Sequence, residues 1–443
     1  MQQYIAQPVG TVAGTVRLPG DKSISHRALM LGGIADGDTD IHGFLDSEDC
    51  LATLAALRAL GVRIERPAAT EVRVHGVGVD GLRAASGALD MGNAGTAMRL
   101  FMGLLAPQRF DSTLIGDASL MRRPMERVAQ PLRLMGAHID THEGRPPVRI
   151  HGGAVLRAID YRMPVASAQL KSALLLAGLA AQGITSVTEP APTRDHTERM
   201  LAGFGVRLVS DTVGVAAPGE AAAARVRLQG GQRLRGCRVD VPGDFSSAAF
   251  FVVAGCLAAQ PVLRLHNVGV NPTRTGLLEL LRLMGAQITV QRQADDGPEP
   301  IADIEVRASR LHGIRVPEAL VPLAIDEFPA FFIAAACAEG ETVVTGAAEL
   351  RVKESDRLAS MAEGLTRLGI GCELLPDGIR IQGGRIRGGR IDSHGDHRIA
   401  MSFAIASVRA AAPIEIDDVA NVATSFPNFL ELARAAGLAV HAS

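Results

Sequence analysis

Short polar segments that precede apolar helical stretches carry the residues best suited to chemistry. The first of these segments, at residues 19–27, reads PGDKSISHR. Ser23 and Arg27 are four residues apart and share one helix face, with Lys22 beside them. Unpaired N–H groups and the helix dipole favour anions at a helix N-terminus. Two cations and a hydroxyl there suit a phosphate, although a solvated basic turn would show the same local pattern.

Two further helix starts offer mostly neutral groups to an anion. Residues 93–99 read NAGTAMR, and Gly95 in the first turn leaves room for a ligand to approach the backbone. Tight packing between helices is the alternative reason for this glycine. Residues 167–172 read SAQLKS, which offers neutral donors suited to a polyol phosphate.

Two arginine-bearing loops also precede helices. Residues 121–125 read MRRPM, and arginine is preferred for a bidentate grip on carboxylate or phosphate. Residues 193–198 read TRDHTE, which brings Arg194 and also resembles a helix-capping arrangement. A surface position would explain the first pair of arginines, and the cap alone would explain the second segment.

The C-terminal half supplies carboxylates that could move protons. Residues 325–328 read IDEF, so two carboxylates lie between apolar neighbours that could tune the pKa of a general base. N-capping is the alternative role for one of this pair. Lys353 and Arg357 are four residues apart with Glu354 adjacent, and as an isolated charge run they would form a solvated helix start.

The last polar segment, HGDHR at residues 394–398, begins another apolar stretch. His394 and His397 suggest a metal, but no third ligand cluster accompanies them, and Arg398 would repel a cation. An anion is therefore the better ligand, and no metal site is predicted. A GxGxxG match at residues 76–81 lacks the βαβ context that a dinucleotide site requires.

Pairs of helices must position these segments. Amphipathic stretches end in glycines that fit the helix C′ position, namely Gly61, Gly136, Gly205, Gly285, Gly369 and Gly437. A second helix type precedes each of these stretches and is apolar nearly all round, so it should be buried. We expect these buried helices at residues 23–35, 94–105, 168–181, 246–259, 329–338 and 398–409.

The helix pairs define a repeat of strand, buried helix, strand, surface helix and two strands. The length of 443 residues also exceeds the size at which single cores stop growing. Pro-Gly pairs at residues 19–20 and 242–243 are natural crossover points. We therefore expect an α/β chain of two similar domains, 20–241 and 1–19 plus 242–443, with three repeats in each. Ordinary connections between helices and strands, without a true repeat, are the alternative.

Composition excludes several classes of protein. The chain is 47% hydrophobic and 21% charged, which favours folded cores over disorder. A net charge of −2 gives no support for binding to nucleic acid or a membrane surface. Apolar runs are too short to span a bilayer. Five scattered cysteines without a CxxC pattern fit reduced thiols, and no targeting segment is visible, so we expect a cytoplasmic protein.

Taken together, the polar segments resemble those of a known family. The matching segments are PGDKSISHRALML at 19–31, NAGTAMRL at 93–100, RRPM at 122–125, SAQLKSALLLAG at 167–178, RVKESDRL at 351–358 and DHRIAMSF at 396–403. In this order they resemble the 3-phosphoshikimate 1-carboxyvinyltransferases, also called 5-enolpyruvylshikimate-3-phosphate synthases, of the enolpyruvyl transferase family. The resemblance runs nearly the whole length. It implies two similar domains of three βαβαββ units each, resembling inside-out α/β barrels, with substrates bound between them.

The resemblance also implies the reaction. Phosphoenolpyruvate would donate its enolpyruvyl group to the 5-hydroxyl of 3-phosphoshikimate, with release of phosphate, by addition and elimination in the shikimate pathway. No metal and no organic cofactor are implied. The expected partners are these two small molecules, with no nucleic acid and no membrane, and the chain is expected to act as a monomer.

Roles for individual residues are carried over from the family's motifs. The 3-phosphoshikimate set is Lys22, Ser23, Arg27, Ser167, Ala168, Gln169, Arg194, Asp326 and Lys353. The phosphoenolpyruvate set is Lys22, Asn93, Gly95, Arg123, Gln169, Arg357, His397 and Arg398. The catalytic set is Asp326 as base for the 5-hydroxyl, Glu354 for the proton at the methylene carbon, and Lys22. Both substrates are polyanions, so surrounding cations would offset their mutual repulsion.

Some positions vary within the family. Many members carry lysine in an AKTFP-like stretch, but this chain reads ATSFP at 423–427, so Thr424 replaces one phosphoenolpyruvate cation. Some members that tolerate glyphosate have alanine at the position of Gly95. Glycine here leaves room for the inhibitor, and we expect sensitivity.

Other families and classes give alternative interpretations. UDP-N-acetylglucosamine enolpyruvyl transferases share the repeat but typically show Lys-Asn at the first helix and a reactive cysteine in the loop that here spans 118–123. RNA 3′-phosphate cyclases use similar units but need a nucleotide-reactive histidine and a basic surface. A non-catalytic binding protein of the same repeat would not require Asp326 and Glu354 beside the cations.

Overall fold

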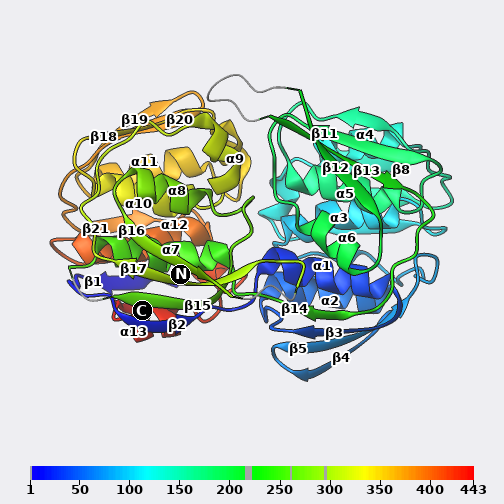
Figure 1. The fold of residues 1–443 in the computed structure, drawn as a ribbon, viewed down its shortest axis with the longest axis horizontal. Helices are drawn as coiled ribbons and strands as arrows, with labels where there is room; N and C mark the ends of the chain where they lie inside the picture. The colour runs from blue at the N-terminus through cyan, green and yellow to red at the C-terminus, as the bar shows by residue number, and fades with distance from the viewer. Residues whose placement is uncertain (1, 215–221, 260–261, 294–296) are drawn as a thin grey trace. The chain divides into compact units, whose positions relative to one another are not determined.

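Six small β-sheets contain the strands of the described residues, 2–214, 222–259, 262–293 and 297–443, in this computed structural model. Three sheets belong to a compact unit of residues Gly20–Val241. The other three belong to a second unit, made of Met1–Pro19 and Pro242–Ser443. Figure 1 follows the chain through the helices and strands by colour. Within the described ranges, no helix is long and apolar enough to cross a lipid bilayer.

Strands of the unit Gly20–Val241 pair in one repeated pattern. Their bounds are β3 (Asp36–His42), β4 (Arg63–Ala68), β5 (Glu71–Val77), β6 (Leu89–Asp90), β7 (Ser112–Ile115), β8 (His138–His142), β9 (Arg145–His151), β10 (Asp160–Arg162), β11 (Ile184–Glu189), β12 (Leu208–Val213), β13 (Ala223–Gln229) and β14 (Arg238–Asp240). The sheet orders are β14-β3-β5-β4, β6-β7-β9-β8 and β10-β11-β13-β12. In each order the first two strands are parallel and the other pairs are antiparallel.

Strands of the second unit follow the same pattern, except that one sheet has three strands in place of four. Their bounds are β1 (Tyr4–Gln7), β2 (Gly14–Arg17), β15 (Leu263–Gly269), β16 (Gln287–Arg292), β17 (Ile301–Arg307), β18 (Glu341–Val344), β19 (Gly371–Leu375), β20 (Gly378–Gln382), β21 (Gly389–Asp392), β22 (Ile414–Asp417) and β23 (Ala439–Ala442). The sheet orders are β16-β17-β15-β2, β18-β20-β19 and β21-β22-β1-β23. In the three-stranded sheet, two isolated parallel bridges, from His312 to Glu339 and from Arg315 to Val343, stand where the other sheets have a full first strand.

Strands β2 and β14 each pair with a strand that is distant in the sequence. β2 comes just before residue 20, yet it pairs parallel with β15 of the second unit. β14 comes just before residue 242, yet it pairs parallel with β3 of the unit Gly20–Val241. Each unit therefore completes its first sheet with the strand that precedes the first buried helix of the other unit. Simple repetition along the chain would have placed each strand beside the helix that follows it.

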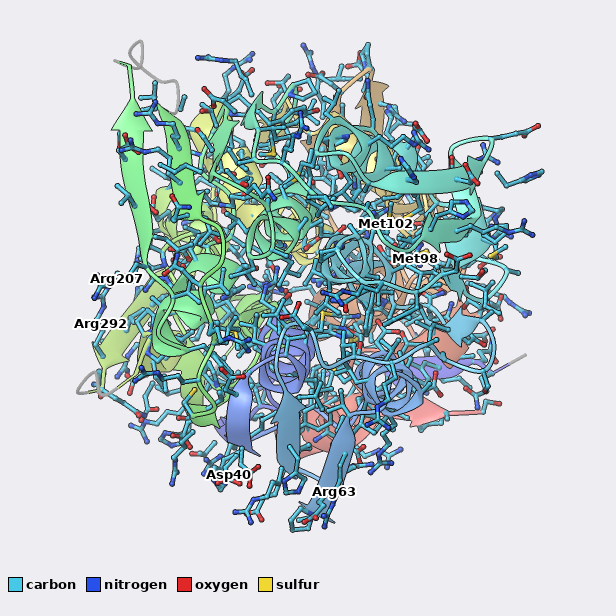
Figure 2. The ribbon with its side chains drawn as sticks, turned by 90° about the vertical axis from the view of Figure 1, so that its right-hand side faces the viewer. Asp40, Arg63, Met98, Met102, Arg207 and Arg292 are labelled. Atoms are coloured by element: carbon cyan, nitrogen blue, oxygen red, sulfur yellow. The ribbon has the colours of Figure 1, made fainter. Side chains whose placement is uncertain are left out.

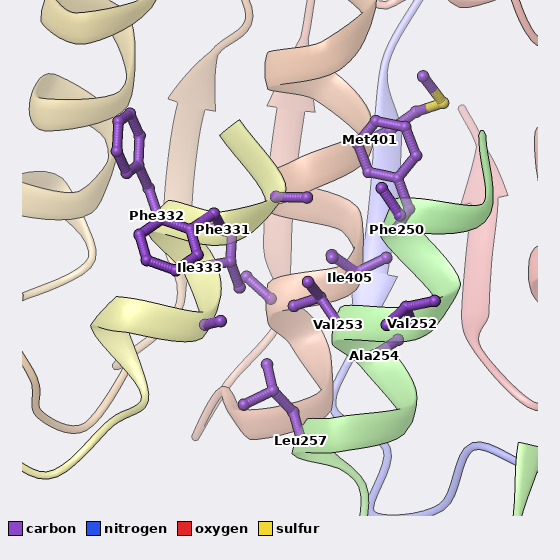
Figure 3. Packing of buried hydrophobic residues seen from close by; sticks show 14 of the residues in the cluster. Phe250, Val252, Val253, Ala254, Leu257, Phe331, Phe332, Ile333, Met401 and Ile405 are labelled. Carbon is purple, nitrogen blue, oxygen red and sulfur yellow. The ribbon is translucent and has the colours of Figure 1, made fainter. Parts of the chain in front are cut away.

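The apolar helices predicted from the sequence are present, with their ends shifted by a few residues. They are α1 (Lys22–Gly33), α3 (Gly95–Leu105), α5 (Ala168–Gly178), α7 (Phe245–Leu257), α10 (Phe328–Ala336) and α12 (His397–Ala406), and the short α9 (Val321–Ala324) precedes α10. Figure 3 shows α7, α10 and α12 meeting through side chains such as Phe250, Val253 and Ile405. Burial of an aliphatic or phenyl side chain of this kind contributes about 1.5–3 kcal/mol.

Close packing also joins α3 and α5 in the other unit. A Cβ placed on Gly103 would lie 2.1 Å from the carbonyl oxygen of Ala173, so only glycine allows this approach. Met98 and Met102 of α3 are fully buried, whereas Asp40 and Arg63 lie on the strands near the lower rim of Figure 2. Apolar side chains thus surround most of the helix bodies in the core.

The outer helices end as the sequence predicted. They are α2 (Glu48–Ala59), α4 (Glu126–Leu134), α6 (His196–Gly203), α8 (Gly276–Leu283), α11 (Arg357–Arg367) and α13 (Phe429–Ala435). All six expected C′ glycines have left-handed φ angles, between 86° and 101°. At α2, for example, the amide of Gly61 donates to Arg58 O and that of Val62 donates to Leu57 O, both at 3.0 Å. These two hydrogen bonds form a Schellman motif, so the predicted C′ role of the glycine is confirmed. The helices and sheets together confirm the predicted α/β class.

Candidate active site

The polar start of α1 is held by three neighbouring helices. The ammonium of Lys22 donates to Asp49 Oδ2 of α2 at 2.6 Å, and the Lys22 side chain stays 20% exposed. The buried Arg27 donates from Nη1 to the carbonyl oxygen of Ser23 at 2.9 Å, so these residues do share one face. Arg27 also donates from Nε to Thr197 Oγ1 at 2.7 Å, which joins α1 to α6. The interpretation as a solvated turn is therefore wrong for Arg27.

A buried histidine separates the two cations of α1. His26 forms a 2.7 Å hydrogen bond between Nδ1 and Thr53 Oγ1 of α2. Burial lowers the pKa of His26 well below its usual value, and the positive charges of Lys22 and Arg27 lower it further. His26 is therefore neutral at physiological pH and adds no third charge to this helix start.

Gly95 begins α3 directly against an arginine. The guanidinium of Arg123 donates from Nη2 to Asn93 Oδ1 at 2.5 Å and from Nη1 to the carbonyl oxygen of Asn93 at 3.3 Å. A Cβ placed on Gly95 would lie 2.9 Å from Arg123 Nη1 and 3.4 Å from Arg99 Nη1. Gly95 therefore makes room for two cations, and Gly103 is the glycine of α3 that helix packing requires. Of the predicted arginine pair, Arg122 is exposed and Arg123 is buried.

Arg99, which the sequence did not single out, links the starts of α3 and α5. Its Nη1 donates to Gln169 Oε1 at 2.6 Å, and Gln169 Nε2 donates to Thr96 Oγ1 at 2.9 Å. Ser167 is the N-cap of α5, and its hydroxyl accepts from the amide of Leu170 at 3.4 Å. The residues from Ser167 to Gln169 thus lie beside the same polar network as Gly95.

The segment at residues 193–198 begins α6 but does not form the expected capping box. Asp195 occupies the N-cap position, and its Oδ2 accepts from Arg199 Nε at 2.8 Å. Glu198 instead pairs with the buried Lys171 at 2.7 Å. Arg194 is half-buried in the same segment. Glu198 therefore serves as a second carboxylate partner of Lys171, beside Glu189.

A buried guanidinium is the centre of the polar cluster in the second unit. Arg357, the first residue of α11, is 1% exposed. Its Nε lies 2.8 Å from Asp396 Oδ2, its Nη2 lies 2.6 Å from Glu354 Oε2, and its Nη1 lies 3.3 Å from Asp326 Oδ1. Asp326 lies two residues before the first residue of α10 and Asp396 is the N-cap of α12, so one arginine joins the starts of three helices.

Lys353 reaches the same carboxylate from outside the helix. A 3-10 turn at Ala348–Val352 ends before Lys353, and α11 begins only at Arg357, so the two cations are not neighbours on one helix as their spacing suggested. Lys353 Nζ nevertheless lies 3.4 Å from Asp326 Oδ1. The predicted solvated helix start is wrong for Arg357, because three carboxylates compensate its burial.

Electrostatics keep the central pair ionised. Burial by itself lowers the pKa of Arg357, but the charges of Asp396, Glu354 and Asp326 outweigh burial and raise that pKa. Burial by itself raises the pKa of Asp396, but the charge of Arg357 outweighs it, and the net pKa lies below the usual value. Asp396 and Arg357 are therefore both charged at physiological pH.

Glu327 has a different environment from its neighbour Asp326. It is 2% exposed, and its Oε1 accepts from the hydroxyl of Ser246. Arg274 Nη2 donates to the same hydroxyl at 2.6 Å, and Arg398 Nη1 donates to the carbonyl oxygen of Asp326 at 2.9 Å. Glu327 occupies the N-cap position of α10 without a side-chain cap bond, so the capping alternative does not describe it.

Ser246 and Arg274 are further polar residues that the sequence interpretation missed. Ser246 follows PGDF at the start of the predicted helix at 246–259, and Arg274 ends an NPTR segment before the helix of residues 276–283. Both therefore had the helix-start placement that selected the other polar residues. The signal was weak because neither segment contains several charges.

The remaining predicted residues lie near the start of α12. His397 is the first residue of this helix and is 4% exposed. Thr424 is also buried, and its hydroxyl donates to the carbonyl oxygen of Asn421 at 2.7 Å. Asn421 in turn donates to the carbonyl oxygen of Gly395 at 2.6 Å. Thr424, which replaces the expected lysine, therefore forms its side-chain hydrogen bond within its own turn.

Each unit collects one part of the predicted set. The unit Gly20–Val241 contains Lys22, Ser23, Arg27, Asn93, Gly95, Arg123, Ser167, Ala168, Gln169 and Arg194. The second unit contains Asp326, Lys353, Glu354, Arg357, His397 and Arg398. The first set is rich in cations and hydroxyls and suits anion binding, whereas the second combines carboxylates with cations and suits proton transfer. Among the described residues, no group of three or more His, Cys, Asp or Glu side chains is arranged to hold a metal ion.

Comparisons with known proteins agree over the whole chain. The family model of EPSP synthase (3-phosphoshikimate 1-carboxyvinyltransferase) matches residues 6–432. A 3-phosphoshikimate 1-carboxyvinyltransferase of Methylococcus capsulatus is 60% identical, over 99% of this chain and 98% of that protein. Another, of Alkalilimnicola ehrlichii, is 59% identical over 99% and 96%. A solved structure of EPSP synthase from Acinetobacter baumannii is 54% identical, with a TM-score of 0.86 and full coverage of both chains.

Loss of the Asp396 carboxylate should destabilise the second unit strongly. We expect Asp396→Asn to lower the free energy of unfolding by about 3–5 kcal/mol at pH 7, because a buried guanidinium then loses its most deeply buried compensating charge. The pKa of Asp396 is lowered on folding, so its contribution is present above the usual aspartate pKa and is lost as pH falls through the lowered value. Urea denaturation followed by circular dichroism at pH 7 and in acid measures this difference.

An exposed ion pair provides the control. Arg310 and Glu339 lie 2.7 Å apart with side chains 78% and 57% exposed, so Glu339→Gln should change stability little at any pH. Equal effects of the two substitutions would contradict the role given to Asp396.

Proposed function

Because this chain belongs to the EPSP synthase (3-phosphoshikimate 1-carboxyvinyltransferase) family, we propose that its two polar clusters together carry out enolpyruvyl transfer. The enzyme is a transferase of the shikimate pathway, which leads to aromatic amino acids. It joins phosphoenolpyruvate to the 5-hydroxyl of 3-phosphoshikimate and releases phosphate. Relatives of this name at about 60% identity over the full chain disfavour the UDP-N-acetylglucosamine enolpyruvyl transferases and a non-catalytic role.

The contacts of Asp326 are the observation that best supports its assignment as the general base. Its Oδ1 lies 3.4 Å from Lys353 Nζ and 3.3 Å from Arg357 Nη1, and Glu354 lies on the other side of the same guanidinium. Two cations favour the ionised carboxylate, which is the form that accepts a proton. The second carboxylate is close enough to act on the same reacting molecule.

Binding of two polyanions requires several cations. We assign 3-phosphoshikimate to Lys22, Ser23, Arg27, Ser167, Ala168, Gln169, Arg194, Asp326 and Lys353. We assign phosphoenolpyruvate to Lys22, Asn93, Gly95, Arg123, Gln169, Arg357, His397 and Arg398. Fixed guanidinium groups such as Arg27 and Arg123 support these assignments, because preset donors bind anions without a large loss of side-chain freedom.

Proton transfer accompanies both stages of the reaction. Glu354 is protonated when both substrates are bound. Asp326 accepts the proton of the 5-hydroxyl as its oxygen attacks C2 of phosphoenolpyruvate, and Glu354 delivers its proton to the methylene carbon. Elimination then breaks the bond from C2 to the phosphate oxygen, the new methyl group returns a proton to Glu354, and the proton held by Asp326 passes to the departing phosphate. Alignment of the two reactants lowers the barrier by about 7–11 kcal/mol. Lys22 stabilises negative charge on phosphoenolpyruvate during both stages.

Further features of the enzyme follow as proposals. The compact units Gly20–Val241 and Met1–Pro19 with Pro242–Ser443 are its two domains. It acts as a monomer in the cytoplasm and takes no nucleic acid. All five cysteines are free, and burial raises the pKa of Cys256 and Cys337 to about 12. Such unreactive, reduced thiols support a reducing compartment.

Phosphate release provides the direct test of function. We expect purified protein to release phosphate from phosphoenolpyruvate only when 3-phosphoshikimate is present. Asp326→Asn should lower kcat about 10²–10⁴-fold, because general base catalysis is lost. Asp80→Asn, at an aspartate 79% exposed in the other unit, should turn over normally. Release that does not depend on 3-phosphoshikimate would refute the function, and normal turnover of Asp326→Asn would refute only the base.

Gly95→Ala should weaken phosphoenolpyruvate binding and glyphosate inhibition together. The new Cβ would lie 2.9 Å from Arg123 Nη1, so the guanidinium must leave its position on Asn93. We expect the KM for phosphoenolpyruvate to rise about tenfold, which is the effect of losing one charge-assisted hydrogen bond. Steady-state kinetics with and without glyphosate measure both changes.

A second glycine substitution controls for the added methyl group. Gly87→Ala places its Cβ in open space and outside the left-handed region of φ, so KM and inhibition should not change. Glyphosate inhibition that is the same in Gly95→Ala and in the unaltered enzyme would contradict the steric explanation.

A further inference from the structure

A buried ion triad lies behind the segment that carries Arg194. Lys171 of α5 is 3% exposed, and its Nζ lies 2.8 Å from Glu189 Oε1 and 2.7 Å from Glu198 Oε1. Glu189 is the last residue of β11, and Glu198 lies in the first turn of α6. These two elements are the ones that the segment at residues 190–195 connects. The triad therefore ties together both ends of this segment and the helix beneath it.

The amide, the carbonyl oxygen and the hydroxyl of Thr193 all form hydrogen bonds with Lys171 or Glu189. Its amide donates to Glu189 Oε1 at 3.2 Å, and its hydroxyl donates to Glu189 Oε2 at 2.5 Å. Lys171 Nζ donates to the carbonyl oxygen of Thr193 at 3.4 Å. Arg194 is the next residue, so the backbone from which its side chain extends is fixed on one side by the pair Lys171–Glu189.

Burial and pairing together set the charges of the triad. Burial by itself lowers the pKa of Lys171, but the two glutamates outweigh burial and raise it, so the ammonium is charged. Burial raises the pKa of Glu198, and the charge and hydrogen bond of Lys171 offset only part of that rise. Buried ion pairs contribute little net stability compared with apolar packing. Their fixed geometry is the property that this site retains.

The same two helices also fix Arg27. Ser172 follows Lys171 on α5, and Thr197 precedes Glu198 on α6. The hydroxyls of Ser172 and Thr197 lie 2.7 Å apart, and Arg27 donates to both, from Nη2 at 2.9 Å and from Nε at 2.7 Å. One pair of helices thus sets both the Arg27 guanidinium and the backbone that precedes Arg194.

We propose that Lys171 and Glu189 are positioning residues that preset Arg194, relative to Arg27, to bind the phosphate of 3-phosphoshikimate. This inference rests on the proposed function, which assigns both arginines to that substrate. Neither Lys171 nor Glu189 needs to touch the substrate, because each acts through Thr193. Preset donors lose less conformational entropy on binding than mobile ones do, so disturbing the pair should weaken binding of the phosphate.

Calorimetric titration of the full chain with 3-phosphoshikimate and with shikimate tests this proposal. We expect Arg194→Ala to raise the Kd for 3-phosphoshikimate about tenfold or more and to leave the Kd for shikimate nearly unchanged, since only the first ligand carries the phosphate. Glu189→Gln should show the same selective loss. The double variant should bind no more weakly than Arg194→Ala alone, because both substitutions remove one interaction.

Two further variants separate positioning from stability. Thr193→Val removes only the hydroxyl that donates a hydrogen bond to Glu189, and it should selectively weaken 3-phosphoshikimate binding as Glu189→Gln does. Thr193→Ser keeps the hydroxyl and should bind 3-phosphoshikimate as the unaltered chain does. Thr193→Val also carries the test if Glu189→Gln does not fold. Val187→Ala, at a fully buried residue of β11, should lower the melting temperature without changing the Kd for 3-phosphoshikimate.

The outcomes distinguish this inference from the function on which it rests. Absence of 3-phosphoshikimate binding in the unaltered chain would overturn the proposed function, and the positioning role with it. Unchanged binding in Arg194→Ala would overturn the assignment of that arginine and this inference. Selective loss in Arg194→Ala, together with full binding in Glu189→Gln and Thr193→Val, would overturn the positioning role alone. Additive losses in the double variant would also overturn it.

Discussion

The buried guanidinium of Arg357 is the interaction on which the candidate chemistry depends. A fully desolvated cation is costly, and here its compensation comes from Asp396, Glu354 and Asp326, which belong to three different helix starts. The planar guanidinium carries five donors in a fixed fork, and here they reach three carboxylates at once. The guanidinium that contacts the N-cap residue of α12 therefore also contacts the proposed base. Structure and chemistry cannot be separated at this residue.

The repeat explains why polar groups gather at helix starts. The buried helices are mostly apolar, as α7 is after Ser247, so charged residues such as Arg27, Arg99 and Lys171 lie in their first two turns. Their N-termini offer unpaired amides and a favourable dipole, which attract carboxylate caps and anionic ligands alike. Asp21 and Asp244 cap α1 and α7 in the same Pro-Gly-Asp setting, yet the first helix continues with Lys22 and Ser23 and the second with Phe245 and Ser246. The repeat thus supplies equivalent positions, and side chains decide which positions bind anions.

Local features could be predicted from the sequence and non-local ones could not. The C′ glycines, such as Gly61, follow from chain geometry within one helix turn, and the apolar helices follow from composition. The division predicted from the Pro-Gly pairs assigns β2 to the second unit and β14 to the unit Gly20–Val241. The partner strands of β2 and β14 could not be inferred from the repeat, because strand pairing depends on contacts between distant residues. For the same reason, the sequence indicated Arg357 as a binding residue but did not indicate that its side chain is buried. It also passed over Lys171, Glu189 and Arg274, whose partners are far apart along the chain.

Replacement of Arg357 by lysine tests the central claim most directly, because it keeps the charge and removes the fork. If one guanidinium must serve Asp396, Glu354 and Asp326 together, Arg357→Lys should remain folded by circular dichroism. Its kcat/KM for phosphoenolpyruvate should nevertheless fall about 100-fold or more, measured as phosphate release with saturating 3-phosphoshikimate. A variant that folds and retains nearly full kcat/KM would show that charge alone is sufficient, and would contradict this account.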